Sequence, residues 1–207
     1  MSDILDELAA VHRAVRTDGA DATVVLTRGY DAPVDDVWDA ITSPERLSRW
    51  FLPVSGDLRL GGTYQLQGNA GGEILRCEPP QLLAVTWLFG ENPLPSQVTV
   101  RLSSEADGAT TTLELEHAAT VDPKFWDEYG PGAVGVGWDL GLLGLALHLR
   151  GDSIGNPEEW ESTPEGRAFA TRSAESWGVA MAATGANPDD VARMVANTTA
   201  FYAPPPS

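Results

Sequence analysis

Six short strand patterns between Asp57 and His117 constrain the fold of this chain more than any other feature. Each is rich in β-branched, aromatic and aliphatic residues, and turns that contain glycine or proline separate them. Connections this short favour antiparallel hairpins, because a parallel pair needs a crossover of a dozen or more residues. The predicted strands cover residues 57–60, 63–67, 73–77, 82–89, 97–103 and 110–117.

One long apolar helix is predicted after these strands, over residues 132–149. Val134, Trp138, Leu142 and Leu145 form a stripe at helical spacing, and further leucines widen it. A helix that is apolar on nearly every side has to be covered by the rest of the protein. Its glycines would weaken an isolated helix, but they permit a close backbone approach, which suits a helix that packs onto a sheet.

The remaining elements are predicted at the two ends of the chain and ahead of the hairpins. They are a helix over residues 3–15, a strand over 23–30, short helices that begin near Pro33 and Pro44, and two C-terminal helices that begin near Pro164 and Pro188. We therefore expect an α+β protein with three parts: an N-terminal helix (1–22), a main domain (23–150) and a helical C-terminal extension packed on it (151–207).

The composition excludes several classes of partner. The 207 residues include 30 acidic and 13 basic side chains, so the net charge is −17. Such an acidic protein repels nucleic acids and anionic membrane surfaces. The single cysteine excludes an internal disulfide and a cysteine-based zinc cluster, and the three histidines lie far apart, so we predict no metal and no cofactor. With no signal-peptide pattern and no apolar run long enough to span a bilayer, we expect a cytoplasmic protein without membrane insertion.

Several motifs, in one order, resemble a known superfamily. Residues 31–42, which include Ala32-Pro33 and Val37-Trp38, resemble the opening of the START-like, or SRPBCC, superfamily. Residues 43–51 resemble the helix that follows in the branch named after the activator of the heat-shock chaperone ATPase. The motifs at 61–64, 71–74, 78–80, 86–87 and 137–140 continue this pattern, and the similarity covers about residues 23–150.

This resemblance implies a helix-grip fold, also called START-like or Bet v 1-like. A seven-stranded antiparallel sheet would curl around the long C-terminal helix. The extra helices predicted at both ends of the chain lie outside this pattern. An apolar cavity would lie between sheet and helix. Members of the superfamily bind lipids, hormones and polyketides, and a minority catalyse cyclisation or related steps. The chaperone-related name belongs to eukaryotic relatives and transfers poorly to a bacterial-type chain like this one.

Elementary packing also predicts a cavity. One curved sheet and one helix cannot fill the space between them with backbone, so side chains fill it or a hollow remains, and a largely apolar hollow is a ligand site by default. Seven tryptophans supply large rigid walls. The residues that we expect to line the ligand site are Trp50, Phe51, Trp87, His117, Trp126 and Trp138.

His117 is the one candidate for catalysis. It shares a strand face with Leu113 and Leu115, and the apolar face should point inward. There it would serve as a hydrogen-bonding group or a general base. The alternative, which is the commoner situation, is a partly exposed histidine at a strand end.

Three functions compete. We favour a protein that binds a small hydrophobic or aromatic molecule in a START-like cavity. The first alternative is an enzyme of the cyclase, aromatase or lyase type that uses His117. The second is a chaperone cofactor or another protein-interaction module, because the terminal helices could form a homodimer surface or a lid. Those helices could instead simply cover the outer face of the sheet.

Overall fold

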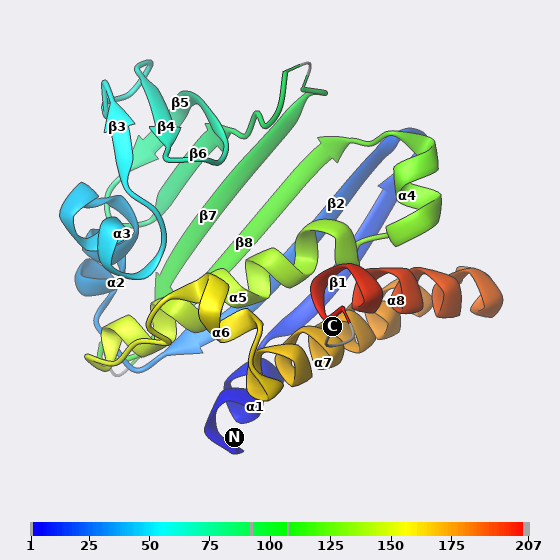
Figure 1. The fold of residues 1–207 in the computed structure, drawn as a ribbon. Coiled ribbons are helices and arrows are strands. Elements are labelled where there is room, and N and C mark those ends of the chain that lie inside the picture. Colours follow the sequence, from blue (N-terminus) through cyan, green and yellow to red (C-terminus); the bar gives the residue numbers. More distant parts are fainter. Residues whose placement is uncertain (1, 92, 107, 205–207) are drawn as a thin grey trace.

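The structure is a computed structural model that describes residues 2–91, 93–106 and 108–204. In this part of the chain, eight strands form one antiparallel sheet in the order β1-β2-β8-β7-β6-β5-β4-β3 (Figure 1). The strands are β1 (His12–Asp18), β2 (Asp21–Tyr30), β3 (Val54–Gly56), β4 (Thr63–Leu66), β5 (Gly71–Glu78), β6 (Leu82–Thr86), β7 (Ser96–Ser104) and β8 (Thr111–Thr120). The helices are α1 (Ser2–Ala9), α2 (Val34–Thr42), α3 (Pro44–Trp50), α4 (Pro123–Tyr129), α5 (Gly132–Leu149), α6 (Pro157–Glu161), α7 (Pro164–Ala182) and α8 (Pro188–Tyr202).

The helix-grip fold predicted from the sequence is confirmed, but the sheet has eight strands, not seven. The additional strand is β1, which lies in a segment predicted as the continuation of the first helix. β1 and β2 form a hairpin whose two-residue loop contains Gly19 at a φ of 59°. Val11 and Val15, both buried, are four residues apart, a spacing that fits a helix face and a strand face equally. Because this segment pairs with β2, it forms a strand and not a helix.

Residues 57–60 do not form the strand that the sequence predicts. These residues form a tight turn, in which the carbonyl of Asp57 accepts from the amide of Arg59 and the carbonyl of Arg59 accepts from that of Gly62. The strand lies just ahead of them, as β3, and pairs with β4.

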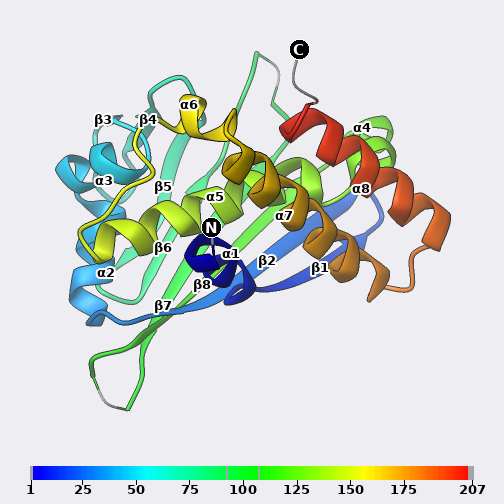
Figure 2. The same cartoon turned by 60° about the horizontal axis from the view of Figure 1, so that its bottom comes forward.

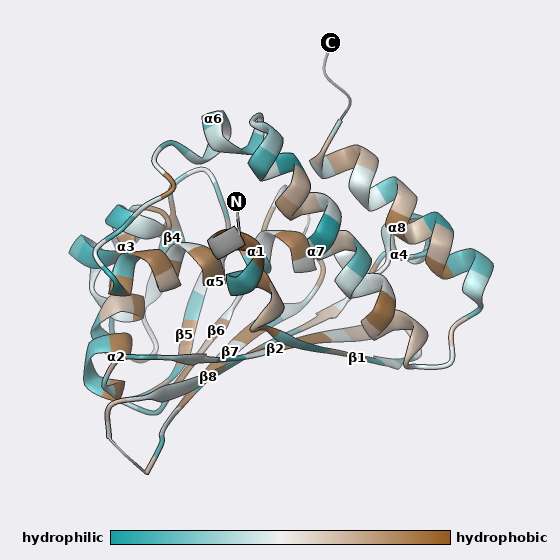
Figure 3. Cartoon of the chain, turned by 90° about the horizontal axis from the view of Figure 1, so that it is seen from below, coloured by the Kyte–Doolittle hydropathy of each residue, from teal (hydrophilic) through white to brown (hydrophobic). Residues whose placement is uncertain are grey.

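All the helices lie on one side of the sheet, as Figure 3 shows. α5 runs over the sheet, and α7 packs beside α5 and against β1 (Figure 2). The C-terminal helices therefore cover α5 and do not cover the outer face of the sheet. That outer face instead carries ion pairs, Arg16 with Glu116 at 2.9 Å and Arg101 with Glu114 at 3.1 Å. α5 has the length and apolar composition of a membrane span, but here it forms part of the core.

Glycines let α5 approach other helices more than the sheet. A Cβ atom at Gly135 would lie 2.2 Å from the ring of Trp177 on α7, and one at Gly144 would lie 2.8 Å from the backbone oxygen of Trp50 on α3. The close approach predicted for these glycines is therefore present, with different partners from those expected.

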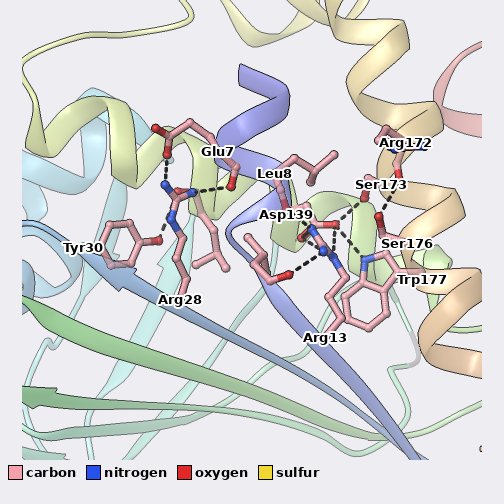
Figure 4. A network of polar contacts seen from close by, with 12 residues as sticks. Glu7, Leu8, Arg13, Arg28, Tyr30, Asp139, Arg172, Ser173, Ser176 and Trp177 are labelled. Carbon is pink, nitrogen blue, oxygen red and sulfur yellow. Dashed lines mark hydrogen bonds and ion pairs between the residues drawn. The ribbon is translucent and has the colours of Figure 1, made fainter. Parts of the chain in front are cut away.

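A buried ionic network fixes α5 between β1 and α7 (Figure 4). Asp139, only 1% exposed, accepts hydrogen bonds from the guanidinium of Arg13 at 2.9–3.1 Å, from the indole of Trp177 at 3.0 Å and from the hydroxyl of Ser173. Arg13 also donates to the carbonyls of Leu8 and Val11. This carboxylate thus joins the N-terminal segment, the long helix and the C-terminal extension, and its buried charge is fully partnered.

Candidate functional site

An apolar cavity of about 200 Å³ lies between the sheet, α5 and the two short helices α2 and α3. Strands β6, β7 and β8 contribute aliphatic side chains whose register places them side by side, such as Leu83, Val100 and Leu115. From α5, Leu142 and Leu145 complete the wall. We call this space the inner cavity.

The two short helices close one end of the inner cavity. Pro44 supplies the fixed φ that favours the first turn of α3, which ends at Trp50. The indole nitrogen of Trp50 donates to the carbonyl of Ala40 on α2 at 3.0 Å, so the two helices are joined through the cavity wall. Phe51 follows directly and stacks in a tilted arrangement with Trp50, at 5.4 Å between ring centroids.

A second space of about 420 Å³, the outer cavity, lies near the first residues of β7 and the N-terminal half of α5. It is more polar than the inner cavity, because Ser96, His117 and Asn69 line it. Tyr202 of α8 also borders it and donates its hydroxyl to the carbonyl of Ala133 at 2.7 Å. Burial raises the pKa of Tyr202 to about 12, so this phenol is neutral at physiological pH.

Three aromatic side chains, Phe51, Trp87 and Trp138, line both cavities. The rings of Trp87 and Trp138 lie 4.9 Å apart between centroids. We call these three residues the aromatic partition. A ligand in either cavity would contact it, and a ligand that extended from one cavity into the other would pass along it.

His117 lies beside the aromatic partition and is only 7% exposed, so the alternative of a partly exposed strand-end histidine is wrong. Its Nδ1 accepts a hydrogen bond from the indole nitrogen of Trp138 at 3.0 Å, and its Nε2 lies 2.7 Å from the hydroxyl of Ser96. Burial lowers the pKa of His117 from 6.5 to about 4, so the imidazole is neutral near pH 7.

The hydrogen bonds of His117 define which ring nitrogen carries its proton. An indole N–H can only donate, so Nδ1 must be the unprotonated nitrogen, and the proton of the neutral ring lies on Nε2. His117 therefore donates to the hydroxyl of Ser96 and cannot accept the proton of that hydroxyl. This arrangement does not activate Ser96 as a nucleophile, and it opposes the role of general base that the enzyme hypothesis assigns to His117.

The structure brings together five of the six residues predicted to line the ligand site. Trp50 and Phe51 line the inner cavity, Trp87 and Trp138 line both cavities, and His117 lines the outer one. Trp126 does not lie with the other five residues. It lies on α4, where it packs half-buried against the core, and it lines neither cavity.

Sequence reasoning missed Ser96, because the predicted strand began one residue later. The alternation of β7 places Ser96 on the same face as Val98 and Val100, so a strand started at Ser96 would have pointed this hydroxyl inward. Within residues 2–91, 93–106 and 108–204, the structure contains no group of three or more His, Cys, Asp or Glu side chains that could hold a metal ion.

A curled antiparallel sheet that grips a long helix around an apolar cavity defines a protein of the helix-grip, START-like class. Within it, the chain belongs to the family described as activator of Hsp90 ATPase homolog 1-like protein, whose family model matches residues 31–149.

Solved structures agree with this assignment. The crystal structure of CalU16 from Micromonospora echinospora is similar to this chain, with 40% identity and a TM-score of 0.67, and the match covers 83% of this chain and 98% of CalU16. The solution NMR structure of CalU16 gives 42% identity and a TM-score of 0.67, and the match covers 84% of this chain and 96% of CalU16. These matches extend beyond residues 31–149 and so include part of the terminal elements.

DynU16, a protein in the dynemicin biosynthetic locus, is similar over 62% of this chain, with 26% identity and a TM-score of 0.55. The match covers 47% of DynU16. A comparison with curated proteins found no match.

Proposed function

We propose that this protein binds one small hydrophobic or aromatic molecule in the inner cavity. The observation that carries the proposal is the cavity itself, about 200 Å³ of apolar space walled by Trp50, Trp87 and Trp138. Apolar cavities of about 150 Å³ accept benzene, so this one suits a molecule of one or two rings. Burial of such a molecule against aliphatic and aromatic walls is favourable at about 25 cal/mol per Å² of apolar surface.

The similarity to DynU16 supports the same proposal, because a locus that builds a small molecule is a setting in which a cavity of this kind is useful. The Hsp90 name in the family description refers to other members, and we carry no chaperone role over to this chain. A cytoplasmic location and a homodimer belong to the proposal as expectations from the sequence.

Thermal unfolding in the presence of a two-ring probe tests the proposal. We expect tetralin, at ten times its Kd, to raise the Tm of the wild-type protein by about 3–6 °C. The substitution Val98→Phe places a larger side chain into the inner cavity and should abolish this shift. The matched control is Val25→Phe on β2, which lies half-exposed at the opposite face of the sheet and should leave the shift unchanged.

Two results would contradict the proposal. One is the lack of any Tm shift for the wild-type protein across a library of one- and two-ring compounds. The other is a shift for Val98→Phe as large as that for the wild-type protein, which would place the ligand outside the inner cavity.

A further inference from the structure

The hydroxyl of Ser96 is a polar group in the outer cavity whose hydrogen is not used by the protein. Ser96 Oγ accepts from His117, as the proton position of the imidazole requires, and Trp87 uses only the backbone carbonyl of Ser96. Among the residues that the structure describes, no acceptor receives the hydroxyl hydrogen of Ser96. This hydrogen is therefore available to a molecule in the cavity that the hydroxyl lines.

Two hydrogen bonds, from Trp138 to His117 and from His117 to Ser96, determine how the hydroxyl of Ser96 can bond. Each group donates to the next, so the serine oxygen accepts and its hydrogen remains to donate. A hydroxyl that already accepts a hydrogen bond in a poorly solvated site is a better donor. The rings of His117 and Trp138 cross at 88° with centroids 5.7 Å apart, and the hydrogen bonds at the two ring nitrogens orient the imidazole between Trp138 and Ser96.

The surroundings define the ligand group that fits. Among the described residues, neither Asp nor Glu lines the inner or the outer cavity, and no cationic side chain lines the outer one. A charged ligand group would be desolvated there without a partner, whereas a neutral acceptor oxygen needs one hydrogen bond only. The aromatic partition lies next to Ser96, so the oxygen would belong to a molecule whose apolar body contacts Trp87 and Trp138.

We propose that the ligand of the inner cavity extends past the aromatic partition into the outer cavity, and that Ser96 is its specificity-determining residue, which donates a hydrogen bond to a carbonyl or similar acceptor oxygen on this otherwise apolar aromatic molecule. His117 and Trp138 are positioning residues that keep the hydroxyl hydrogen free for this bond. The inference rests on the proposed function, since it names the chemical class of the ligand and the polar contact that selects it.

Two probes that differ in one carbonyl group test the inference. α-Tetralone and tetralin share a two-ring body, and only α-tetralone carries an acceptor oxygen. Calorimetric titration of both into the wild-type protein and into Ser96→Ala separates the hydrogen bond from the apolar contribution. We expect Ser96→Ala to weaken α-tetralone about three- to ten-fold, the range of one neutral hydrogen bond, and to change tetralin less than two-fold.

Three variants act as controls. Ser103→Ala changes an exposed serine on the same strand outside both cavities and should leave both affinities unchanged. Ser96→Thr keeps the hydroxyl and should keep the dependence on the carbonyl. Trp138→Phe removes the donor that holds the imidazole proton on Nε2, so Ser96 can donate to His117 instead, and α-tetralone should lose more affinity than tetralin.

The outcomes separate this inference from the proposed function. Tetralin could bind to the wild-type protein while Ser96→Ala weakens both probes equally or weakens neither of them. The role proposed for Ser96 would then be wrong, whereas the proposed ligand binding would be supported. If neither probe binds to the wild-type protein, the proposed function fails for this ligand class, and the role of Ser96 fails with it.

Discussion

His117 is the residue at which protonation and folding are most directly coupled. Burial lowers its pKa to about 4, whereas an unfolded histidine titrates near 6.5. Between these values the unfolded chain binds a proton that the folded protein excludes, so the free energy of unfolding falls as the pH is lowered from 6.5 towards 4. The loss contributed by His117 amounts to about 3 kcal/mol once the pH reaches 4.

Urea denaturation at several pH values checks this prediction. The wild-type protein and His117→Gln should show parallel pH profiles above pH 7 and diverge between pH 6.5 and 4, where the variant loses less stability. A difference profile that is flat over this window would show that the folded and unfolded chains take up the proton of His117 at the same pH, and the lowered pKa of the buried imidazole would then be wrong.

At the residue scale, the sequence predicts which large side chains lie in the cavity wall, but it does not predict which side chains from different strands contact each other. Trp50, Phe51, Trp87 and Trp138 lie in the cavity walls, where the sequence analysis expected them, because in a helix-grip protein the large apolar side chains form both the core and the cavity wall. The function of Ser96 depends on which residue of β8 its strand brings near it. That register is a tertiary property, which strand alternation alone does not define.

At the scale of elements, the contact between α5 and α7 depends on the absence of a side chain at Gly135. In a free helix, Gly→Ala stabilises by about 1 kcal/mol. At Gly135 the new Cβ would lie 2.2 Å from the buried ring of Trp177, which is 1% exposed and held by its bond to Asp139. We therefore expect Gly135→Ala to lower the free energy of unfolding by about 1–3 kcal/mol, as overpacking does in other cores.

Gly137 is the matched control in the same helix. A Cβ there would meet only the hydroxyl of Tyr202, at 4.0 Å, so Gly137→Ala should be neutral or stabilising in the same denaturation experiment. If Gly135→Ala were as stable as Gly137→Ala, the close contact between Gly135 of α5 and Trp177 of α7 would be wrong.

Elements were predictable where local pattern and tertiary packing agree. The hairpins β4 to β8 and the helix α5 follow from short turns and from an apolar run that has to be buried. β1 was missed because Val11 and Val15 fit both periodicities, and its pairing with β2 is what makes it a strand. The two C-terminal helices were placed correctly along the sequence, but nothing in their periodicity states that α7 packs against α5 and β1, or that α8 packs against α7 and α4.

For the whole molecule, the C-terminal extension and the sheet share one continuous hydrophobic core. Trp177, Met181 and Met194 from α7 and α8 belong to the same buried cluster as Leu26 and Leu115 from the sheet. Asp139 adds a buried charge whose partners come from β1 and α7. Residues 151–204 therefore should not unfold separately from the rest, although the sequence suggests an appended segment.

Native-state hydrogen exchange tests this cooperativity. The slowest amides of α7 and of β8 should exchange with the same free energy, because both open only when the whole protein unfolds. Asp139→Asn removes the charge that balances the buried Arg13 and should lower this free energy by roughly 3 kcal/mol. In one cooperative unit the loss is equal in α7 and β8, even though β8 contributes no group to the ionic network. A loss confined to α7 would instead show that the extension is a separate unit docked on the START-like domain.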